Sequence, residues 1–430
     1  MRRLLVSMFL SVLSALACPS LTTAGASDEA LARLLIRKGI LTQEEYEALK
    51  KEIEGVVPPA PQEVADALRD EVRQELKRRD EESIAFTLKV EGEGRWRAHK
   101  DVGDTHSGST SDLFLRRASV GLEARPLDFL TARLVLTSEW FGAQTTDQGQ
   151  PVDDKVTIDE GTITLRSEEV PVYGVFGFRT QPFGAFFSRL VTDPMTQDAY
   201  EVKQAGATLG LTLKTWALDL SATVYRGEEQ MNHLFASGLF DAESVVRSTD
   251  AGFRAETDDV TSFIVAASVA PFKDLLLAAA VLSEPGDARR NTTATASAGY
   301  TLGRVTAEVE FAAALARERY VLQSSGERLG RSFEEKMVSF GLTYRLAKPL
   351  DVAARFEHLW DDGLARQAGI WSADTRASLG VGYTLFEREE TNVRLLGEYR
   401  LTGYRRGGTA RDFATPEQSE AFVKLQVGYR

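Results

Sequence analysis

GFRTQPFGAFFSRLVTDPMTQDAYE, residues 177–201, is the stretch on which the interpretation of this chain depends. It joins two segments whose alternating hydrophobicity is typical of β-strands, yet it is not an ordinary polar loop. Its large apolar side chains are Phe183, Phe186, Phe187, Leu190, Val191, Met195 and Tyr200. An apolar connection of this length would be unfavourable in bulk water. We therefore expect the stretch to fold into a cavity made by its neighbours. A surface loop packed on its own aromatic rings is the alternative.

The same alternation of apolar and polar residues recurs from residue 83 to the end of the chain. Clear examples are residues 86–97, 130–140, 216–225, 305–315, 338–346, 393–401 and 423–429. Alternation alone also suits a soluble sandwich with one wet face. The connections argue against that, because short turns such as Gly303-Arg304 alternate with long loops such as residues 141–154, 180–200 and 226–259. Tight turns at one end and long loops at the other are typical of an outer-membrane barrel.

The alternating segments predict an all-β transmembrane protein, an antiparallel barrel of about 16 strands, an even number as such barrels require. The strands are expected to start near Ser83, Asp112, Leu127, Lys155, Val172, Glu201, Trp216, Val260, Asp274, Asn291, Arg304, Phe333, Leu350, Trp371, Thr391 and Phe413. Aromatic residues near the predicted strand ends are expected to form the interfacial girdles; they are Trp96, Trp140, Tyr225, Trp360, Trp371 and Tyr429. The chain departs from the usual terminal aromatic residue only in that Arg430 follows Tyr429.

The composition agrees with a barrel once both faces of its strands are considered. The 430 residues are 43% hydrophobic with a net charge of -12, and the mean hydropathy is -0.21. A transmembrane barrel shows lipid one face of each strand and water the other, so its average composition looks soluble. After the N-terminal segment no run of about 18 apolar residues predicts a spanning helix. The acidic balance excludes a basic nucleic-acid surface.

Residues 1–26 have the pattern of a secretory signal peptide. Arg2 and Arg3 precede an apolar run, and Ala24-Gly25-Ala26 is a small-x-small cleavage site. Cys18, the single cysteine, lies within this segment and would be lost on cleavage after Ala26. A lipoprotein signal ending at Cys18 is the alternative. A mature chain without cysteine has neither disulfides nor thiolate metal sites.

Residues 27–82 predict a short α-helical region in the periplasm. Gly39 is expected to end a first helix, and Thr42 with Glu45 forms a capping box for a second. A stiff Pro-rich linker follows at residues 56–61. Residues 62–82 then form a charged helix with an apolar stripe at every fourth position. This helix either pairs with copies of itself as a coiled coil, giving a homo-oligomer such as a trimer, or is a solvated spacer.

Three segments resemble the LbtU-type siderophore porins. They are SDLFLRRASVGLEARPLDFLTARLVLTSEW at residues 111–140, VTIDEGTITL at 156–165 and GVFGFRTQPFGAFFSRLVTDPMTQ at 174–197. The resemblance implies a periplasmic coiled-coil region followed by a barrel of about 16 strands, with a ferric siderophore as the solute. Family members often carry a glycine-glutamate pair where this chain has Ala199-Tyr200-Glu201. The phosphate-selective porins are a near competitor, since they share the Arg-Arg second strand.

Residues 180–200 connect the fifth and sixth predicted strands, the position at which general porins place their pore-constricting loop. We therefore predict a constriction formed by Arg179, Gln181, Phe183, Phe186, Phe187, Arg189, Asp193, Met195, Asp198, Tyr200 and Glu201. Arg179 and Arg189 are expected to oppose Asp193, Asp198 or Glu201. Opposed charges of this kind produce a transverse field, which suits zwitterions and polar solutes.

Strand parity assigns the charged residues of the lumen wall. They are Lys89, Glu91, Glu93, Arg95, Arg117, Glu123, Arg133, Glu139, Arg355, Glu357, Arg394 and Glu398, with Glu308, Glu310, Arg400 and Lys424 on the same parity. Most are expected to be solvated wall charges in cross-strand pairs. Their mixed signs argue against a dedicated phosphate channel, because selectivity needs one sign to predominate at the narrowest point. The acidic loop 226–259 is expected to be solvated; repelling anions or receiving a cationic solute are alternatives.

The sequence shows no catalytic constellation, so we predict that the chain is not an enzyme. The four histidines have no metal-ligand spacing, and neither a G-x-S-x-G motif nor a phosphate-binding glycine loop occurs. Neither a metal nor another cofactor is expected. Three functions remain: passive or facilitated uptake of a polar solute such as a ferric siderophore, a general or anion-selective porin, and an outer-membrane anchor with a periplasmic tether. The expected partners are outer-membrane lipid, the solute and copies of the chain.

Overall fold

The computed structural model describes the chain from residue 84 to residue 429, with gaps at 101–107, 144–154, 168, 242–243, 248–258, 288, 389 and 408–416. Ile36, residues 42–44 and Glu47 are described as well. The chain divides into two compact units, Met1–Arg78 and Arg79–Arg430. The predicted signal peptide, linker and coiled-coil helix lie outside the described residues and stay predictions.

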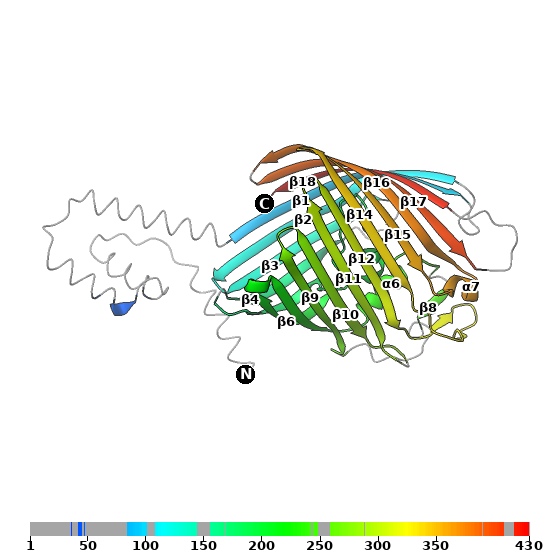
Figure 1. Cartoon of the computed structure of the whole chain (residues 1–430), viewed down its shortest axis with the longest axis horizontal. Coiled ribbons are helices and arrows are strands. Elements are labelled where there is room, and N and C mark those ends of the chain that lie inside the picture. The colour runs from blue at the N-terminus through cyan, green and yellow to red at the C-terminus, as the bar shows by residue number, and fades with distance from the viewer. Residues whose placement is uncertain are drawn as a thin grey trace. The chain divides into compact units, whose positions relative to one another are not determined.

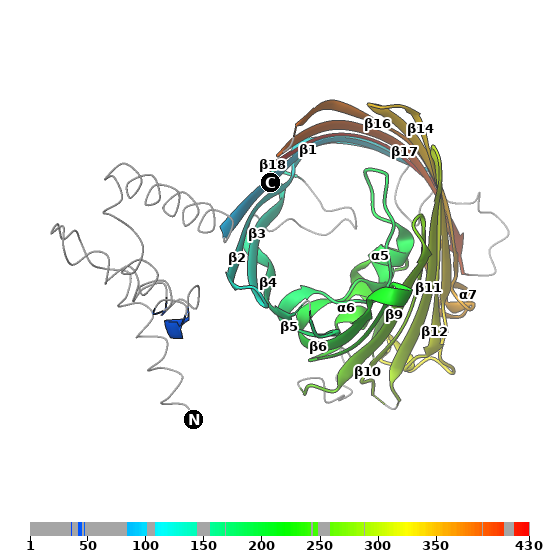
Figure 2. The same ribbon diagram turned by 60° about the vertical axis from the view of Figure 1, so that its left-hand side comes forward.

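The second unit is a closed antiparallel barrel (Figures 1 and 2). Within the described residues its 16 strands are β1 (Ile84–Lys100), β2 (Gly108–Leu127), β3 (Leu130–Phe141), β4 (Val156–Arg166), β5 (Val172–Thr180), β6 (Lys203–Leu213), β7 (Leu218–Tyr225), β9 (Ser262–Phe272), β10 (Leu275–Glu284), β11 (Asn291–Leu302), β12 (Val305–Ala316), β14 (Lys336–Ala347), β15 (Leu350–Trp360), β16 (Trp371–Arg388), β17 (Thr391–Arg406) and β18 (Glu417–Tyr429). Each strand pairs with its sequence neighbours, and β18 closes the ring on β1 over Leu88↔Tyr429 to Lys100↔Glu417.

Six further elements lie in the connections. They are α5 (Met195–Tyr200), the 3-10 turn η2 (Lys214–Trp216), α6 (Glu229–Ala236), α7 (Leu364–Ala368) and the two-stranded sheet of β8 (Val245–Arg247) and β13 (Tyr320–Leu322). No helix among the described residues is long and apolar enough to cross a membrane. The connections at one end of the barrel are short, as in the two-residue turn between β11 and β12, and those at the other end are long.

The predicted fold class is confirmed. The predicted strand starts agree closely with the observed ones, and the largest differences are four residues, Asp112 against Gly108 and Phe413 against Glu417. The period-two pattern predicts the strands correctly because a closed barrel gives each strand one outer and one inner face. On β7, for instance, Leu220, Ala222 and Val224 are exposed while their neighbours Ser221 and Thr223 are buried.

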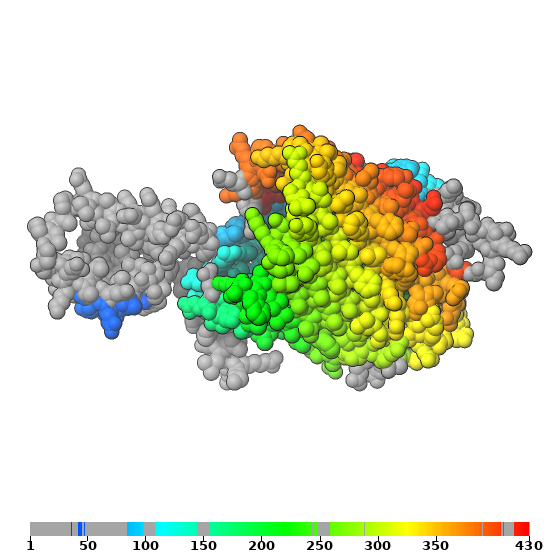
Figure 3. All heavy atoms as spheres, viewed as in Figure 1, coloured from blue at the N-terminus to red at the C-terminus, as the bar shows by residue number. Residues whose placement is uncertain are grey.

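The outer wall is apolar over its whole circumference. Figure 3 shows one side of it, formed by the green to orange strands in chain order. Large side chains on this wall are highly exposed, among them Phe86 at 62%, Phe176 at 67%, Leu209 at 65% and Leu379 at 64%. Exposed apolar surface of this extent is expected where lipid covers the wall.

An arginine on the lipid-facing wall should therefore destabilise the barrel. We expect Leu379→Arg, near the middle of β16, to lower the free energy of unfolding by about 2–4 kcal/mol, because the guanidinium would enter the hydrocarbon layer. Urea unfolding of the purified barrel in lipid vesicles measures this, with Leu379→Val as the control. Equal stability of the arginine variant and the control would contradict a lipid-facing position.

The expected aromatic girdle is correct for only half of its members. Trp96, Trp360 and Tyr429 are exposed on the outer face. Trp140, however, has a left-handed backbone (φ 61°) that turns its indole toward Phe114, and the two rings stack at 5.5 Å. Tyr225 is buried and donates a hydrogen bond to Glu284 (2.6 Å), and Trp371 packs edge-on against Tyr404. Nearness to a strand end does not decide which face a side chain takes.

Candidate functional site

Residues 181–202 leave the barrel wall between β5 and β6 and run into its interior (Figure 2). Thr180 and Lys203 pair directly across the two strands, and the Gln181 amide donates to the Val202 carbonyl at 2.8 Å. A tight turn would therefore be enough to join the strands. The chain instead forms a long insertion, hereafter the inserted loop, which begins and ends at this closed base.

One wall carboxylate holds the turn at residues 184–186 of the inserted loop. Glu310 on β12 accepts hydrogen bonds from the backbone amides of Ala185 (2.8 Å) and Phe186 (3.2 Å) and from the Thr196 hydroxyl (2.8 Å). Gly184 and Phe186 both have positive φ, 83° and 45°. Such a backbone is unfavourable for phenylalanine and persists only where its surroundings fix it. Glu310 supplies those contacts.

Strands on the far side of the lumen bind the rest of the inserted loop. Glu398 on β17 accepts from the Thr192 amide (2.8 Å) and hydroxyl (2.7 Å), and Glu357 on β15 accepts from the Met195 amide at 2.5 Å. Arg355 donates to the carbonyl oxygens of residues 192 (3.0 Å) and 193 (2.9 Å), and Lys424 donates to that of residue 191 (3.1 Å). The inserted loop therefore reaches from β5 and β6 to β12, β15, β17 and β18.

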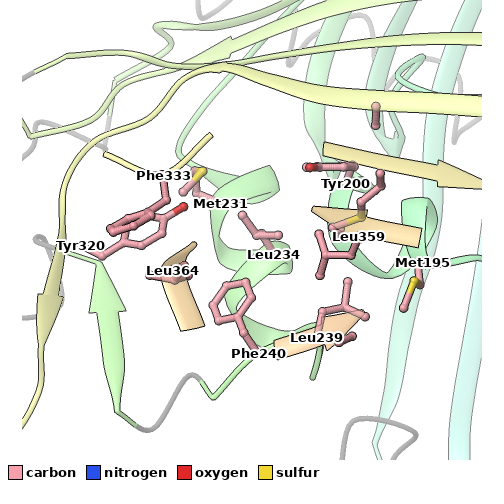
Figure 4. Packing of buried hydrophobic residues seen from close by; sticks show 14 of the residues in the cluster. Met195, Tyr200, Met231, Leu234, Leu239, Phe240, Tyr320, Phe333, Leu359 and Leu364 are labelled. Atoms are coloured by element: carbon pink, nitrogen blue, oxygen red, sulfur yellow. The ribbon is translucent and has the colours of Figure 1, made fainter. Parts of the chain in front are cut away.

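The apolar side chains of the inserted loop join a core inside the barrel. Phe183, Met195 and Tyr200 are fully buried, and Phe186 packs against the same core. Their partners come from α6 and the residues that follow it, the β8–β13 sheet, α7, the connection before β14 and the inner faces of β7, β9, β10, β12 and β14 to β17. Figure 4 shows this packing for Met231, Leu234, Leu239, Phe240, Tyr320, Phe333, Leu359 and Leu364. The apolar content that predicted an inward loop is explained by this core.

A second insertion, between β7 and β9, supports the first. Its helix α6 contacts α5, and Glu284 on β10 accepts from the amides of Gln230 (2.8 Å) and Met231 (3.1 Å) at the start of α6. Arg247 on β8 donates to Glu318 (3.0 Å) and forms an ion pair with Glu228. The expectation of a solvated acidic loop at residues 226–259 is therefore wrong for its described part, because Glu228 is buried in an ion pair and α6 packs in the core.

The predicted opposition of charges within the inserted loop is also wrong. Arg189 pairs with Glu308 of the wall (3.3 Å), and Asp198 pairs with Arg376 on β16 (2.7 Å). Arg179 donates to the Thr208 hydroxyl (3.0 Å), and Glu201 accepts from the Thr180 hydroxyl (3.1 Å). Of the remaining predicted residues, Gln181 donates to the Gln204 carbonyl, Tyr200 donates to Glu335 (3.0 Å), and Phe187 lies over Gly299. Two charges of the loop, Arg189 and Asp198, are thus paired with charges of the wall.

The predicted lumen-wall residues lie in two groups. Arg355, Glu357 and Glu398 bind the inserted loop and are not solvated wall charges, which corrects that expectation for these three. The others form pairs along the wall, namely Lys89–Glu91 (2.7 Å), Arg95–Asp112 (3.8 Å), Arg116–Glu93 (3.9 Å), Arg117–Glu139 (2.7 Å), Arg125–Glu123 (2.7 Å), Arg133–Glu160 (3.3 Å) and Arg394–Asp351 (3.0 Å).

Open space remains in the lumen. A cavity of about 970 Å³ lies at the short-turn end of the lumen, lined by β1 to β4 and by the ends of β16, β17 and β18. Its charged lining alternates in sign, with Lys89, Arg117 and Arg133 beside Glu123 and Glu160. Within the described residues, no group of three or more His, Cys, Asp or Glu side chains could hold a metal ion. The available surface is therefore a water-accessible wall of balanced charge.

Docking of the inserted loop should depend on pH through Asp198. Burial raises the pKa of this carboxyl to about 6, although Arg376 and the more distant Arg400 oppose the shift and Asp193 adds to it. Between about pH 4 and pH 6 the Asp198 carboxyl is therefore protonated in the docked loop. In an undocked loop, where its pKa has the ordinary value near 3.8, the same carboxyl is ionised. Docking is favoured at the acidic end of this window and weakens as the pH rises through it.

We expect hydrogen exchange at residues 195–200, corrected for the intrinsic chemical rate, to be slower at pH 5 than at pH 7. Asp198→Asn should remove most of this difference, because the amide does not titrate. The conservative Asp198→Glu keeps a titrating group and should retain it. An unchanged pH dependence in Asp198→Asn would show that another group controls docking.

The sequence did not reveal the contacts between the inserted loop and the wall. Glu308 and Glu310 have lumen parity, but nothing in the sequence links them to residues 185–196. Thr192, Thr196, Arg376 and Glu335 were not predicted as site residues at all. A signal existed for α6, since Met231, Leu234 and Phe235 have helical spacing inside the acidic loop.

Comparison with known proteins gives relatives by fold alone. No family model matches the chain, and no curated protein matches its sequence. Among solved structures, the chain is similar to the anion-selective porin from Comamonas acidovorans (TM-score 0.53, 10% identity, 81% of this chain and 99% of that one). It is also similar to OprB from Pseudomonas putida (TM-score 0.54, 10% identity, 83% and 96%) and to OmpF from Salmonella typhi, solved with daunomycin (TM-score 0.52, 12% identity, 80% and 97%). The chain therefore has the fold of outer-membrane porins.

Proposed function

We propose that this protein is an outer-membrane porin in which the inserted loop sets the cross-section of the channel. The observation that carries the proposal is the set of contacts between the loop backbone and Glu310, Glu357 and Glu398, carboxylates of strands that lie away from β5 and β6. A loop docked on these distant strands divides the lumen. Solutes then pass beside it, along the wall of β1 to β4.

The charge balance of that wall supports polar solutes of low net charge. Each of its arginines and lysines named above lies within 4.0 Å of a carboxylate, so neither sign predominates along β1 to β4. Selectivity for one type of ion would need an excess of one sign at the narrowest point. We propose zwitterions and polar solutes as the main class, in the outer membrane of a Gram-negative envelope.

The ferric siderophore implied by the sequence resemblance is one candidate within this class. Single-channel conductance in planar bilayers, measured with and without a ferric siderophore, tests it. A siderophore that passes should interrupt the ion current at micromolar concentration, and its iron-free form should do so less. If neither form interrupts the current, the siderophore is excluded as the solute and a general porin remains as the function.

Passage of anions is the second candidate, favoured by the position of Arg189. Its side chain is 57% exposed in the lumen and only partly neutralised by Glu308 at 3.3 Å. We expect Arg189→Glu to shift the reversal potential toward cation preference, because two units of charge change at the constriction. Arg189→Gln should shift it about half as far. Identical reversal potentials in all three proteins would place Arg189 outside the conduction path.

A further inference from the structure

A small cavity of about 170 Å³ lies between the base of the inserted loop and the barrel wall. The loop contributes Pro182 and Gly184, and the wall contributes small side chains from β7, β9, β10 and β11. An engineered protein cavity of about 150 Å³ holds benzene, so a ligand of about six non-hydrogen atoms fits here. The cavity is separate from the larger one at the short-turn end.

Arg179 lines this cavity and differs from the other lumenal cations. No carboxylate of the described residues lies within 4.0 Å of its guanidinium, which donates a hydrogen bond to the neutral Thr208 hydroxyl at 3.0 Å. Glu160, on the adjacent strand, is already bound to Arg133 (3.3 Å) and to the Thr162 hydroxyl (3.2 Å). A guanidinium has five N–H donors, so most of those on Arg179 are free for a ligand.

The hydroxyl groups of the cavity are free as well. Ser221, Ser268, Thr295 and Ser297 line it, and none of their hydroxyls bonds to another side chain or carbonyl of the described residues. Asp219 is the carboxylate on the lining. Its two oxygens accept from the Tyr173 hydroxyl (2.8 Å) and from the Thr212 hydroxyl (2.7 Å), and the Arg166 guanidinium lies 4.0 Å away. Each of its oxygens therefore already accepts one hydrogen bond.

We infer that this cavity is a binding subsite for a small hydroxycarboxylate, held by Arg179 through the carboxylate and by the serine and threonine hydroxyls through the rest of the molecule. The planar guanidinium matches a carboxylate with two parallel hydrogen bonds. A single cation suits a monoanion better than a phosphate dianion, for which a second positive charge would be needed. The subsite rests on the proposed porin function, because a solute reaches the cavity through the lumen.

Binding of D-glycerate to the full-length protein in detergent tests the inference, with glycerol as the uncharged match and inorganic phosphate as the rival anion. We expect saturable binding of glycerate, at least about tenfold weaker binding of glycerol and phosphate, and a loss of about tenfold or more in Arg179→Met. Ser297→Ala should weaken glycerate binding severalfold. Arg304→Met, in the turn between β11 and β12, removes one positive charge away from the cavity and should bind like the wild type.

The result that overturns the subsite is equal binding of glycerate by the wild type and Arg179→Met, or tighter binding of glycerol or phosphate. If Arg179→Met loses the heat-modifiable gel mobility of a folded barrel, Arg179→Lys and Ser297→Ala decide in its place. Conductance is measured on the same preparations. Conducting channels that bind no glycerate contradict the subsite alone, whereas binding without conductance contradicts the porin function and leaves the subsite standing.

Discussion

Removing residues 182–200 should raise the single-channel conductance by about twofold or more, because current follows the narrowest cross-section of a pore. The design is feasible because Thr180 and Lys203 already pair across β5 and β6, so Gln181 and Glu201 can be joined by a Gly-Ser turn. The deletion also takes Phe183, Met195 and Tyr200 out of the internal core, so α6 will be less firmly held. Folding must therefore be checked by heat-modifiable mobility before conductance is compared.

Phe187→Ala is the milder companion to this deletion. Phe187 follows the turn at residues 184–186, lies over Gly299 and is not a member of the internal core. We expect a smaller rise in conductance with an unchanged barrel. If the deletion folds and still conducts like the wild type, the inserted loop does not limit the current and the proposed function of this segment is wrong.

Loss of Glu310 should release the turn at residues 184–186 of the inserted loop. Glu310→Ala leaves the amides of Ala185 and Phe186 and the hydroxyl of Thr196 without their acceptor, and an unsatisfied buried donor costs about 1–3 kcal/mol. The positive φ of Phe186 then loses its support as well. We expect faster hydrogen exchange at residues 184–196 and rapid current fluctuations in planar bilayers.

Glu123→Ala is the matched control for Glu310→Ala. Its carboxylate also lies on the lumen wall, but it bonds to Arg125 two residues along the same strand and not to the inserted loop. Neither exchange at residues 184–196 nor current noise should change. Steady current and slow exchange in Glu310→Ala would mean that the remaining contacts, from Glu357, Glu398 and Arg355, are enough to hold the loop.

The contact of Glu310 with the inserted loop joins distant parts of the sequence. Glu310 lies more than a hundred residues from Ala185 and Thr196 along the chain. In the folded barrel the lumen brings β12 against residues 185–196. Distance along the chain says little about contact across a closed ring, because the inward faces of all strands share one interior.

The sequence by itself determined the wall of this protein. Alternation such as that of residues 218–225 is sufficient to predict a strand with one lipid face and one inner face, and alternating short and long connections predict closure of the sheet. The apolar residues of 177–201 predicted that this stretch leaves the water, as Phe183 and Met195 do. These are local or periodic properties of the sequence. The burial of apolar side chains can be predicted from them without knowing which residues those side chains contact.

Only the tertiary structure decided which charges meet. Arg189 pairs with Glu308 and Asp198 with Arg376, partners that no spacing in the sequence connects. Within the described residues Arg179 has no carboxylate partner, which is equally a result of three-dimensional position, since Glu160 pairs with Arg133. Many carboxylates share the lumen-facing parity, so parity alone does not identify the partner of a given arginine or lysine. The choice among them depends on the path of the inserted loop through the barrel, which the buried core of α5 and α6 fixes.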